Sequence, residues 1–229
     1  MMRELREQVL HANLELARRG LARFTFGNAS AIDRASGLVA IKPSGMPYDH
    51  MAAADLVVVT LEGQVVEGAH RPSSDLATHL VLYRAFNGIG GITHTHSHYA
   101  TVWAQARREI PCLGTTHADH FHGSIPVTEP LTPAETADDY EVNTGQMIVR
   151  RMAWLDTRTM PAVLVSGHAP FCWGDDVSAA VETASLLEEV ARLAYHTALL
   201  APDASPIDDH LRDRHFHRKH GDGRYYGQP

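Results

Sequence analysis

The segment from Gly90 to His98, GGITHTHSH, constrains the fold of this chain most strongly. Ile92 and its β-branched neighbours favour an extended strand over residues 91–96, in which side chains alternate between two faces. His94 and His96 then project side by side from one face, as a pair that suits a divalent metal. Because the chain has 16 histidines, a polar surface strand without a metal is the alternative interpretation.

Two distant segments offer further metal ligands. Ser73-Ser74-Asp75 lies upstream of the histidine pair and carries a carboxylate, and Ser166-Gly167-His168 lies downstream and carries a third imidazole. Together these residues supply three nitrogens and one oxygen, a set that zinc accepts and that manganese or iron also tolerates. Each has a structural alternative, since Asp75 suits the start of a helix and His168 suits a turn.

Length, charge and cysteine content restrict the class of protein. The 229 residues are enough for one domain with a full core, and no Pro/Gly/Ser-rich linker divides them. A net charge of -7 repels nucleic acid and anionic membranes, so we expect neither as a partner. The charged N-terminus and the absence of a long apolar run predict a soluble cytoplasmic protein. Cys112 and Cys172 both lie in apolar settings, which argues against a thiolate metal cluster.

Hydrophobic spacing and turn residues predict the order of the elements. Helices are expected at residues 3–19, 75–84, 98–106, 132–152 and 177–200, and Pro202 and Pro206 separate the last from a tail at 207–229. Strands are expected at residues 31–33, 38–42, 55–60, 64–67, 91–96, 162–165 and 171–173. Because the first four strands read as hairpins, we predict a single-domain α/β fold with a mixed or largely antiparallel sheet flanked by helices.

Several loops carry groups that suit an anion. They combine one cation with hydroxyls and free backbone amides, without any glycine-rich nucleotide motif. Taken singly, each has an ordinary structural explanation as a turn or a helix cap. Only their convergence would indicate a phosphate pocket, and the residues concerned are Asn28, Lys42, Ser44, Gly45, Ser73 and Ser74.

Acid–base chemistry has its own candidates. The side chains able to exchange a proton include Asp119, Glu141, His117, His215 and the tyrosines near the end of the chain. A tyrosine has an ordinary pKa of about 10, so it needs a nearby metal, cation or hydrogen bond to act near neutral pH. The residues alone therefore leave the terminal tyrosines without a role.

Taken together, seven segments resemble the class II aldolase/epimerase family. Their order and spacing run through nearly the whole chain, and the fifth and the last point to the epimerase branch. The segments are Thr25-Phe26-Gly27-Asn28-Ala29-Ser30, Ile41-Lys42-Pro43-Ser44-Gly45, Pro72-Ser73-Ser74-Asp75, Gly90-Gly91-Ile92-Thr93-His94-Thr95-His96-Ser97, Leu113-Gly114-Thr115-Thr116-His117-Ala118-Asp119, Ser166-Gly167-His168 and Tyr225-Tyr226-Gly227-Gln228.

The resemblance implies a three-layer α/β/α domain over residues 1–229 and a role for each matching residue. It implies zinc ligands at Asp75, His94, His96 and His168. It implies a phosphate pocket at Asn28, Lys42, Ser44, Gly45, Ser73 and Ser74. It also implies that Asp119 and Tyr226 exchange protons in a neighbouring subunit of a homotetramer, which the tail at 207–229 completes, with Thr115, Glu141 and His215 in supporting positions.

The activity implied is inversion of a phosphorylated ketopentose at C4, from L-ribulose 5-phosphate to D-xylulose 5-phosphate. In the family, zinc chelates the ketone and a neighbouring hydroxyl and stabilises the enediolate formed when the C3–C4 bond breaks. The aldehyde fragment turns and is attacked again. The alternatives are a class II aldolase that cleaves a phosphorylated ketose such as L-fuculose 1-phosphate, and a non-catalytic scaffold on the same fold.

The chain departs from the family pattern at a few positions. Ala169 replaces a usual glycine, Leu76-Ala77 replaces Thr-Pro, His98-Tyr99 stands where arginine and histidine are common, and Glu129 replaces a frequent arginine. None of these departures removes a proposed ligand or proton carrier. They bear on which phosphorylated sugar the pocket accepts.

Overall fold

A central seven-strand sheet organises the computed structural model, which describes residues 2–220, 224 and 225. The spatial order is β4-β3-β2-β1-β5-β7-β6, and all neighbouring strands pair antiparallel. The antiparallel prediction is therefore confirmed. The strands are β1 (Asn28–Asp33), β2 (Leu38–Ile41), β3 (Val57–Thr60), β4 (Val65–Glu67), β5 (Gly91–His94), β6 (Ala162–Leu164) and β7 (Pro170–Gly174).

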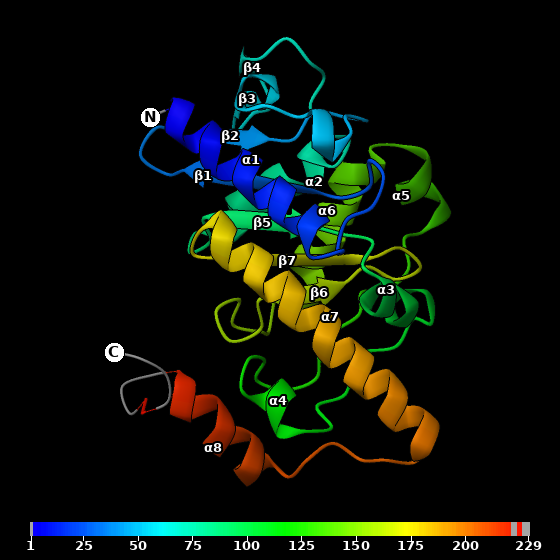
Figure 1. Cartoon of the computed structure of the whole chain (residues 1–229). Helices are drawn as coiled ribbons and strands as arrows, with labels where there is room; N and C mark the ends of the chain where they lie inside the picture. The colour runs from blue at the N-terminus through cyan, green and yellow to red at the C-terminus, as the bar shows by residue number, and fades with distance from the viewer. Residues whose placement is uncertain (1, 221–223, 226–229) are drawn as a thin grey trace.

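Two long helices cover one face of the sheet, as Figure 1 shows for α1 (Met2–Arg18) and α7 (Val177–Leu200). In α1 the buried apolar side chains recur every three or four residues, as an amphipathic helix requires, and they are Leu5, Val9, Ala12 and Leu16. The N-terminus of α7 lies directly on β5, where a Cβ on Gly91 would come within 2.3 Å of the Val177 Cα. Only glycine therefore fits at that point of the strand.

The opposite face is covered by α2 (Leu76–Ala85) and α6 (Tyr140–Met152), which pack against each other. The side chain of Ser30 on β1 reaches α2, where its Oγ lies 2.7 Å from His79 Nδ1. Strand alternation then decides the direction of the β5 side chains. Because Thr93 donates to the Ala180 carbonyl on α7, His94 points to the opposite face, towards α2.

The remaining described helices are short or peripheral. They are the 3-10 turns η1 (Tyr48–His50) and η2 (Ala53–Asp55), and the α-helices α3 (His98–Gln105), α4 (Thr115–Ala118), α5 (Pro133–Ala137) and α8 (Asp209–Lys219). Helix α4 packs against α8 at one end of the molecule, away from β1 and β2 in Figure 1. Within the described residues, we find no helix with the length and hydropathy to cross a membrane.

Three expectations need correction. The predicted strand over 91–96 ends at His94, so His96 lies just beyond it. The predicted helix over 132–152 is two helices, because Asp139 adopts a left-handed conformation with φ 50° between α5 and α6. The tail after Pro206 contains helix α8, which we did not predict.

Candidate metal centre and anion pocket

Three imidazoles converge at the end of β5. His94 ends this strand, His96 follows two residues later, and His168 belongs to the turn between β6 and β7. The Nε2 atoms of His94 and His96 are 3.2 Å apart, and the ring centroid of His168 is 4.9 Å from that of His94 and 5.1 Å from that of His96. One ligand nitrogen from each ring lies within 4.8 Å of the other two.

Neighbouring groups fix the orientation of two of these rings. His94 Nδ1 donates to the Pro170 carbonyl at 2.9 Å, which leaves the Nε2 lone pair for the cluster, and the ring stacks on Phe171. His168 Nδ1 lies 3.5 Å from the Tyr140 hydroxyl. A hydrogen bond on the far nitrogen of a histidine is the usual outer partner in a metal site.

The pKa shifts of His168 and Asp75 favour the protonation states that bind a cation. Burial, with a smaller contribution from the nearby His94 and His96, lowers the pKa of His168 to about 4, so this imidazole is neutral at pH 7. For the Asp75 carboxyl, burial raises the pKa, but His94, His79 and a hydrogen bond from Asn28 together outweigh burial and lower it. A neutral imidazole and an ionised carboxylate are the protonation states that metal ligands require.

Asp75 lies at the start of α2 and faces the same cavity as the histidines. Its Oδ2 accepts a hydrogen bond from Asn28 Nδ2 at 2.6 Å. Among the described residues, only the three histidines form a group whose ligand atoms all lie within 4.8 Å of one another. Asp75 is not part of this group. The nitrogen donors, with this carboxylate beside them, fit a divalent metal.

A cavity of about 300 Å³ contains both the histidine cluster and the predicted anion-binding groups. It lies where the start of β1 and the ends of β2 and β5 meet the starts of α2 and α6. Its lining includes every predicted metal and phosphate residue together with Glu141. The lining residues are Thr25, Phe26, Gly27, Asn28, Lys42, Pro43, Ser44, Gly45, Ser73, Ser74, Asp75, His94, His96, Tyr140, Glu141 and His168.

Backbone hydrogen bonds join the lysine loop to the serine loop. Ser73 N–H donates to the Lys42 carbonyl and Ser44 N–H donates to the Arg71 carbonyl, both at 2.9 Å. These bonds bring hydroxyls from both loops to one side of the cavity. The residues predicted to bind an anion therefore line a single cavity, and their role in binding phosphate stays a prediction.

Lys42 is a buried cation at this side of the cavity, with 2% of its surface exposed. Its Nζ lies 3.4 Å from the carbonyl oxygens of Thr25 and Pro43. Across the described part of the chain, no carboxylate lies within ion-pair distance of it. Burial lowers its pKa. A buried ammonium in a cavity that is also lined by serine hydroxyls is electrostatically suited to an anion.

Gly27 allows the preceding loop to approach the strand that ends in His94. Its φ is 77°, and a Cβ at this position would lie 2.8 Å from the His94 carbonyl oxygen. Both the left-handed backbone and the close contact exclude larger residues. This turn places Asn28 beside Asp75.

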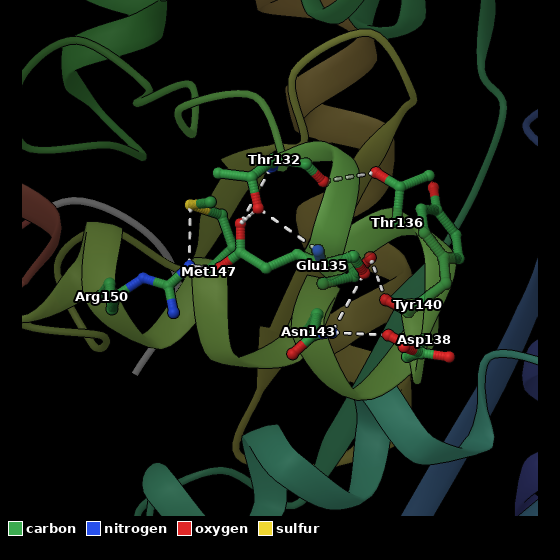
Figure 2. A network of polar contacts seen from close by, with 9 residues as sticks. Thr132, Glu135, Thr136, Asp138, Tyr140, Asn143, Met147 and Arg150 are labelled. Carbon is green, nitrogen blue, oxygen red and sulfur yellow. Dashed lines mark hydrogen bonds and ion pairs between the residues drawn. The ribbon is translucent and has the colours of Figure 1, made fainter.

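The corner between α5 and α6 places Tyr140 and Glu141 in the cavity lining. Figure 2 shows the contacts that hold this corner. The predicted capping box is present, with Glu135 N–H donating to Thr132 Oγ1 and Thr132 N–H donating to Glu135 Oε2. Asn143 Nδ2 donates to the Glu135 carbonyl at 3.0 Å and to the Asp138 carbonyl at 2.8 Å, which links the two helices across the break.

Some cavity residues were not predicted from the sequence: Thr25, Phe26, Gly27, Pro43 and Tyr140. Most of them lie next to or near a predicted residue in the sequence, and this proximity could have indicated that they also line the cavity. Tyr140 had a separate signal, because the polar pair at 138–139 interrupts the apolar spacing of the helix that contains it.

A second group of predicted residues lies outside this cavity, at the contact between α4 and α8. Asp119 accepts two hydrogen bonds from Arg218, at 2.9 and 2.6 Å, and one from His215 at 3.1 Å. Burial raises the pKa of Asp119, but Arg218 and His215 outweigh it and the net shift is downward. Thr115 begins α4, and its carbonyl accepts from Asp119 N–H.

The structure therefore does not bring Asp119, Thr115 or His215 to the histidines within one chain. Tyr226 lies outside the described residues. The family departures Leu76, Ala169, His98 and Glu129 are not part of the cavity lining, although Leu76 follows Asp75 and Ala169 follows His168. Leu76 and Ala169 are buried, and His98 and Glu129 are exposed.

Comparisons with known proteins agree with the fold. L-ribulose-5-phosphate 4-epimerase UlaF of Salmonella paratyphi A is 51% identical over 227 residues, covering 99% of this chain and 100% of that protein. The protein of the same name from Salmonella typhi matches equally. Among solved structures, an L-fuculose 1-phosphate aldolase is 26% identical with a TM-score of 0.79, covering 94% of this chain and 95% of that one.

A structure titled as YgbL from Klebsiella pneumoniae, at 24% identity and a TM-score of 0.75 over 93% of this chain and 98% of that one, shares the fold. The family described as Class II Aldolase and Adducin N-terminal domain matches residues 7–195, which include the whole cavity lining. This chain belongs to the class II aldolase and adducin N-terminal domain family.

Proposed function

We propose that the protein is a zinc-dependent epimerase that interconverts L-ribulose 5-phosphate and D-xylulose 5-phosphate at C4. The observation that carries the proposal is the cavity itself, whose lining combines three converging imidazoles and a carboxylate with a buried lysine and serine hydroxyls. The full-length relatives at 51% identity that are named as this epimerase support the substrate.

In this proposal, Asp75, His94, His96 and His168 hold the metal. A divalent ion so held supplies Lewis-acid polarisation of a ketone and stabilises the negative charge that develops when the neighbouring carbon–carbon bond breaks. The protein's part is to present neutral nitrogens and an ionised carboxylate. Zinc is proposed over manganese or iron because nitrogen donors dominate the set.

The phosphate group is assigned to the other side of the cavity. Lys42 contributes the charge, and the loop residues Asn28, Ser44, Gly45, Ser73 and Ser74 contribute hydrogen bonds. Holding the phosphate keeps the aldehyde fragment in place after the C3–C4 bond breaks. The fragment can then turn its carbonyl face and recombine with inverted configuration at C4, whereas a site that released it would be an aldolase.

Proton transfer is assigned to Asp119 and Tyr226 of a neighbouring subunit in a homotetramer, one accepting and the other donating. The position of Asp119 on the α4–α8 unit, outside the cavity of its own chain, supports a contribution between subunits. Thr115, His215 and Glu141 are proposed as supporting residues. Residues 1–229 would form one domain, whose tail at 207–229 completes the neighbouring site. Because a phosphorylated sugar does not cross membranes unaided, we place the reaction in the cytoplasm.

The decisive experiment is incubation of the protein with L-ribulose 5-phosphate while carbon NMR follows the products. Appearance of D-xylulose 5-phosphate supports the proposal. Accumulation of aldehyde and ketone fragments would instead indicate an aldolase, the activity named for one of the similar structures. Elemental analysis of the purified protein adds the metal, and absence of a stoichiometric divalent metal would favour a scaffold.

A further inference from the structure

Tyr48 contacts two parts of the anion pocket, the Phe26–Gly27 turn and Lys42, although it does not line the cavity itself. It begins the 3-10 turn η1, shortly after the Lys42–Gly45 loop, and only 6% of its surface is exposed. A buried tyrosine needs partners for its hydroxyl and its ring. Both sets of partners belong to the pocket.

The hydroxyl of Tyr48 holds the turn that leads to Asn28. It lies 2.8 Å from the Phe26 carbonyl oxygen and 2.9 Å from the Gly27 carbonyl oxygen, and shares its single proton between them. This is the left-handed turn that packs on the His94 carbonyl. Tyr48 thus ties one wall of the cavity to the segment that follows the lysine loop.

The ring of Tyr48 faces the ammonium group of Lys42. The Nζ atom lies 4.9 Å from the ring centroid, within the range of a cation–π interaction. The other neighbours of Nζ are the carbonyl oxygens of Thr25 and Pro43 at 3.4 Å. Among the residues that the structure describes, these contacts of the buried charge are all with neutral groups, which orient it without neutralising it and leave it available to an anion.

We propose that Tyr48 is a positioning residue for phosphate recognition. Its ring orients Lys42 and its hydroxyl fixes the Phe26–Gly27 turn, so both parts of the pocket are already in position before a phosphate dianion binds. This inference rests on the proposed function. It predicts that Tyr48 sets affinity for the phosphate group and has little influence on metal binding or on the chemical step.

The test compares Tyr48→Phe, which keeps the ring, with Tyr48→Leu, which removes ring and hydroxyl. Tyr83→Phe is the matched control, because the Tyr83 hydroxyl is also buried and donates to a backbone carbonyl, that of Ser30, at 3.0 Å outside the cavity. For each protein we would measure KM and kcat for L-ribulose 5-phosphate, zinc content, thermal stability, and the Kd for inorganic phosphate by calorimetry.

We expect Tyr48→Phe to raise both KM and the Kd for phosphate about fivefold, the effect of one neutral hydrogen bond, and Tyr48→Leu to raise them further. Zinc content should stay unchanged and kcat should change by about twofold at most. Tyr83→Phe should lower thermal stability without changing either constant. Unchanged KM and Kd in a folded Tyr48→Phe protein, or an equal loss of zinc, would overturn the inference.

The phosphate titration needs no turnover, so it separates the two hypotheses. A wild-type protein that binds phosphate through Tyr48 but does not epimerise L-ribulose 5-phosphate contradicts only the proposed function. If the wild-type protein is an epimerase but its phosphate affinity does not change in Tyr48→Phe, only this inference is contradicted. Should Tyr48→Leu fail to fold, Tyr48→Phe alone decides.

Discussion

Asn28 and Asp75 meet through a 2.6 Å hydrogen bond from the amide nitrogen to a carboxylate oxygen. The donor comes from the first residue of β1 and the acceptor from the start of α2, so the bond joins the sheet to the helix that covers it. A second donation, to Ser73 Oγ at 3.0 Å, connects the amide with the serine loop. Asn28 therefore contacts both the proposed metal ligand and the proposed phosphate residues.

Replacing Asn28 with alanine should weaken metal binding about tenfold, because the Asp75 carboxylate loses the partner that orients it. Competition with a chromophoric chelator measures the affinity. Asn13→Ala is the control, since the Asn13 side chain is also buried but bonds only backbone groups of Val9 and Ala29. Equal losses of metal affinity in both variants would indicate general destabilisation.

His96→Asn should abolish both metal binding and epimerisation, because two imidazoles and one carboxylate hold a metal far more weakly than the full set. Metal content by elemental analysis and turnover of L-ribulose 5-phosphate check this. His98→Asn, an exposed histidine two residues later that does not line the cavity, should keep both. An unchanged metal content in His96→Asn would remove His96 from the proposed ligands.

Glu188 supports the segment that carries His96. From α7, its carboxylate accepts the backbone N–H groups of Tyr99 at 2.8 Å and Ala100 at 3.0 Å, in the first turn of α3. Glu188→Ala should lower the free energy of unfolding by about 1–2 kcal/mol, as loss of a charged helix cap does. Urea denaturation measures this, and Glu189→Ala should have almost no effect, since its partner Arg192 is exposed.

Stability should fall with acidification through His117. Burial lowers the pKa of this histidine to about 4, and its Nε2–H donates to the Gly123 carbonyl at 2.8 Å. The unfolded chain, with an ordinary histidine pKa near 6.5, binds more protons between about pH 6.5 and 4. The stabilisation from neutral His117 is therefore complete above pH 6.5 and is lost as the pH falls through that window.

The loss attributable to His117 is about 3 kcal/mol over that range. Urea titrations of metal-free protein at a series of pH values would measure it. His117→Gln should flatten the dependence, because glutamine does not titrate. A dependence as steep in the variant as in the wild type would assign the effect to other histidines, such as His120, whose pKa burial also lowers to about 4.

Tyr226→Phe should cut epimerisation by at least about a hundredfold while zinc and phosphate binding stay intact, because general acid–base catalysis contributes on that order. Its neighbour Tyr225, which is exposed, provides the control as Tyr225→Phe. Full activity in Tyr226→Phe would reassign the proton carrier.

The parts of the fold that the sequence predicted well are those set by local patterns. The spacing of Leu5, Val9, Ala12 and Leu16 defined α1, and Thr132 with Glu135 marked the start of α5. Helix α8 was missed because its polar, histidine-rich sequence buries only Phe216, so no apolar stripe was visible. The break at Asp139 was missed because the polar pair at 138–139, its one local signal, also fits an exposed turn of a continuous helix.

The candidate site was predictable for a different reason. His94, His168, Lys42 and Asp75 have side chains whose chemistry points to a ligand, and the family resemblance assigns them to one site. Tyr48 was not singled out, because its importance depends on contacts with Gly27 and Lys42 that only the folded chain creates. Residues that act by positioning others have no distinctive composition.

The contact between Gly91 and Val177 has a consequence for how this family can vary. One side of β5 faces the cavity that contains the histidine cluster, and substitutions in the cavity lining can change which sugar fits. The other side is sealed against α7 so tightly that a single added methyl group must push the helix away, and with it the strand that ends in His94. Natural variants are therefore expected to differ in the loop residues that line the cavity, while the face of β5 that contacts α7 stays the same.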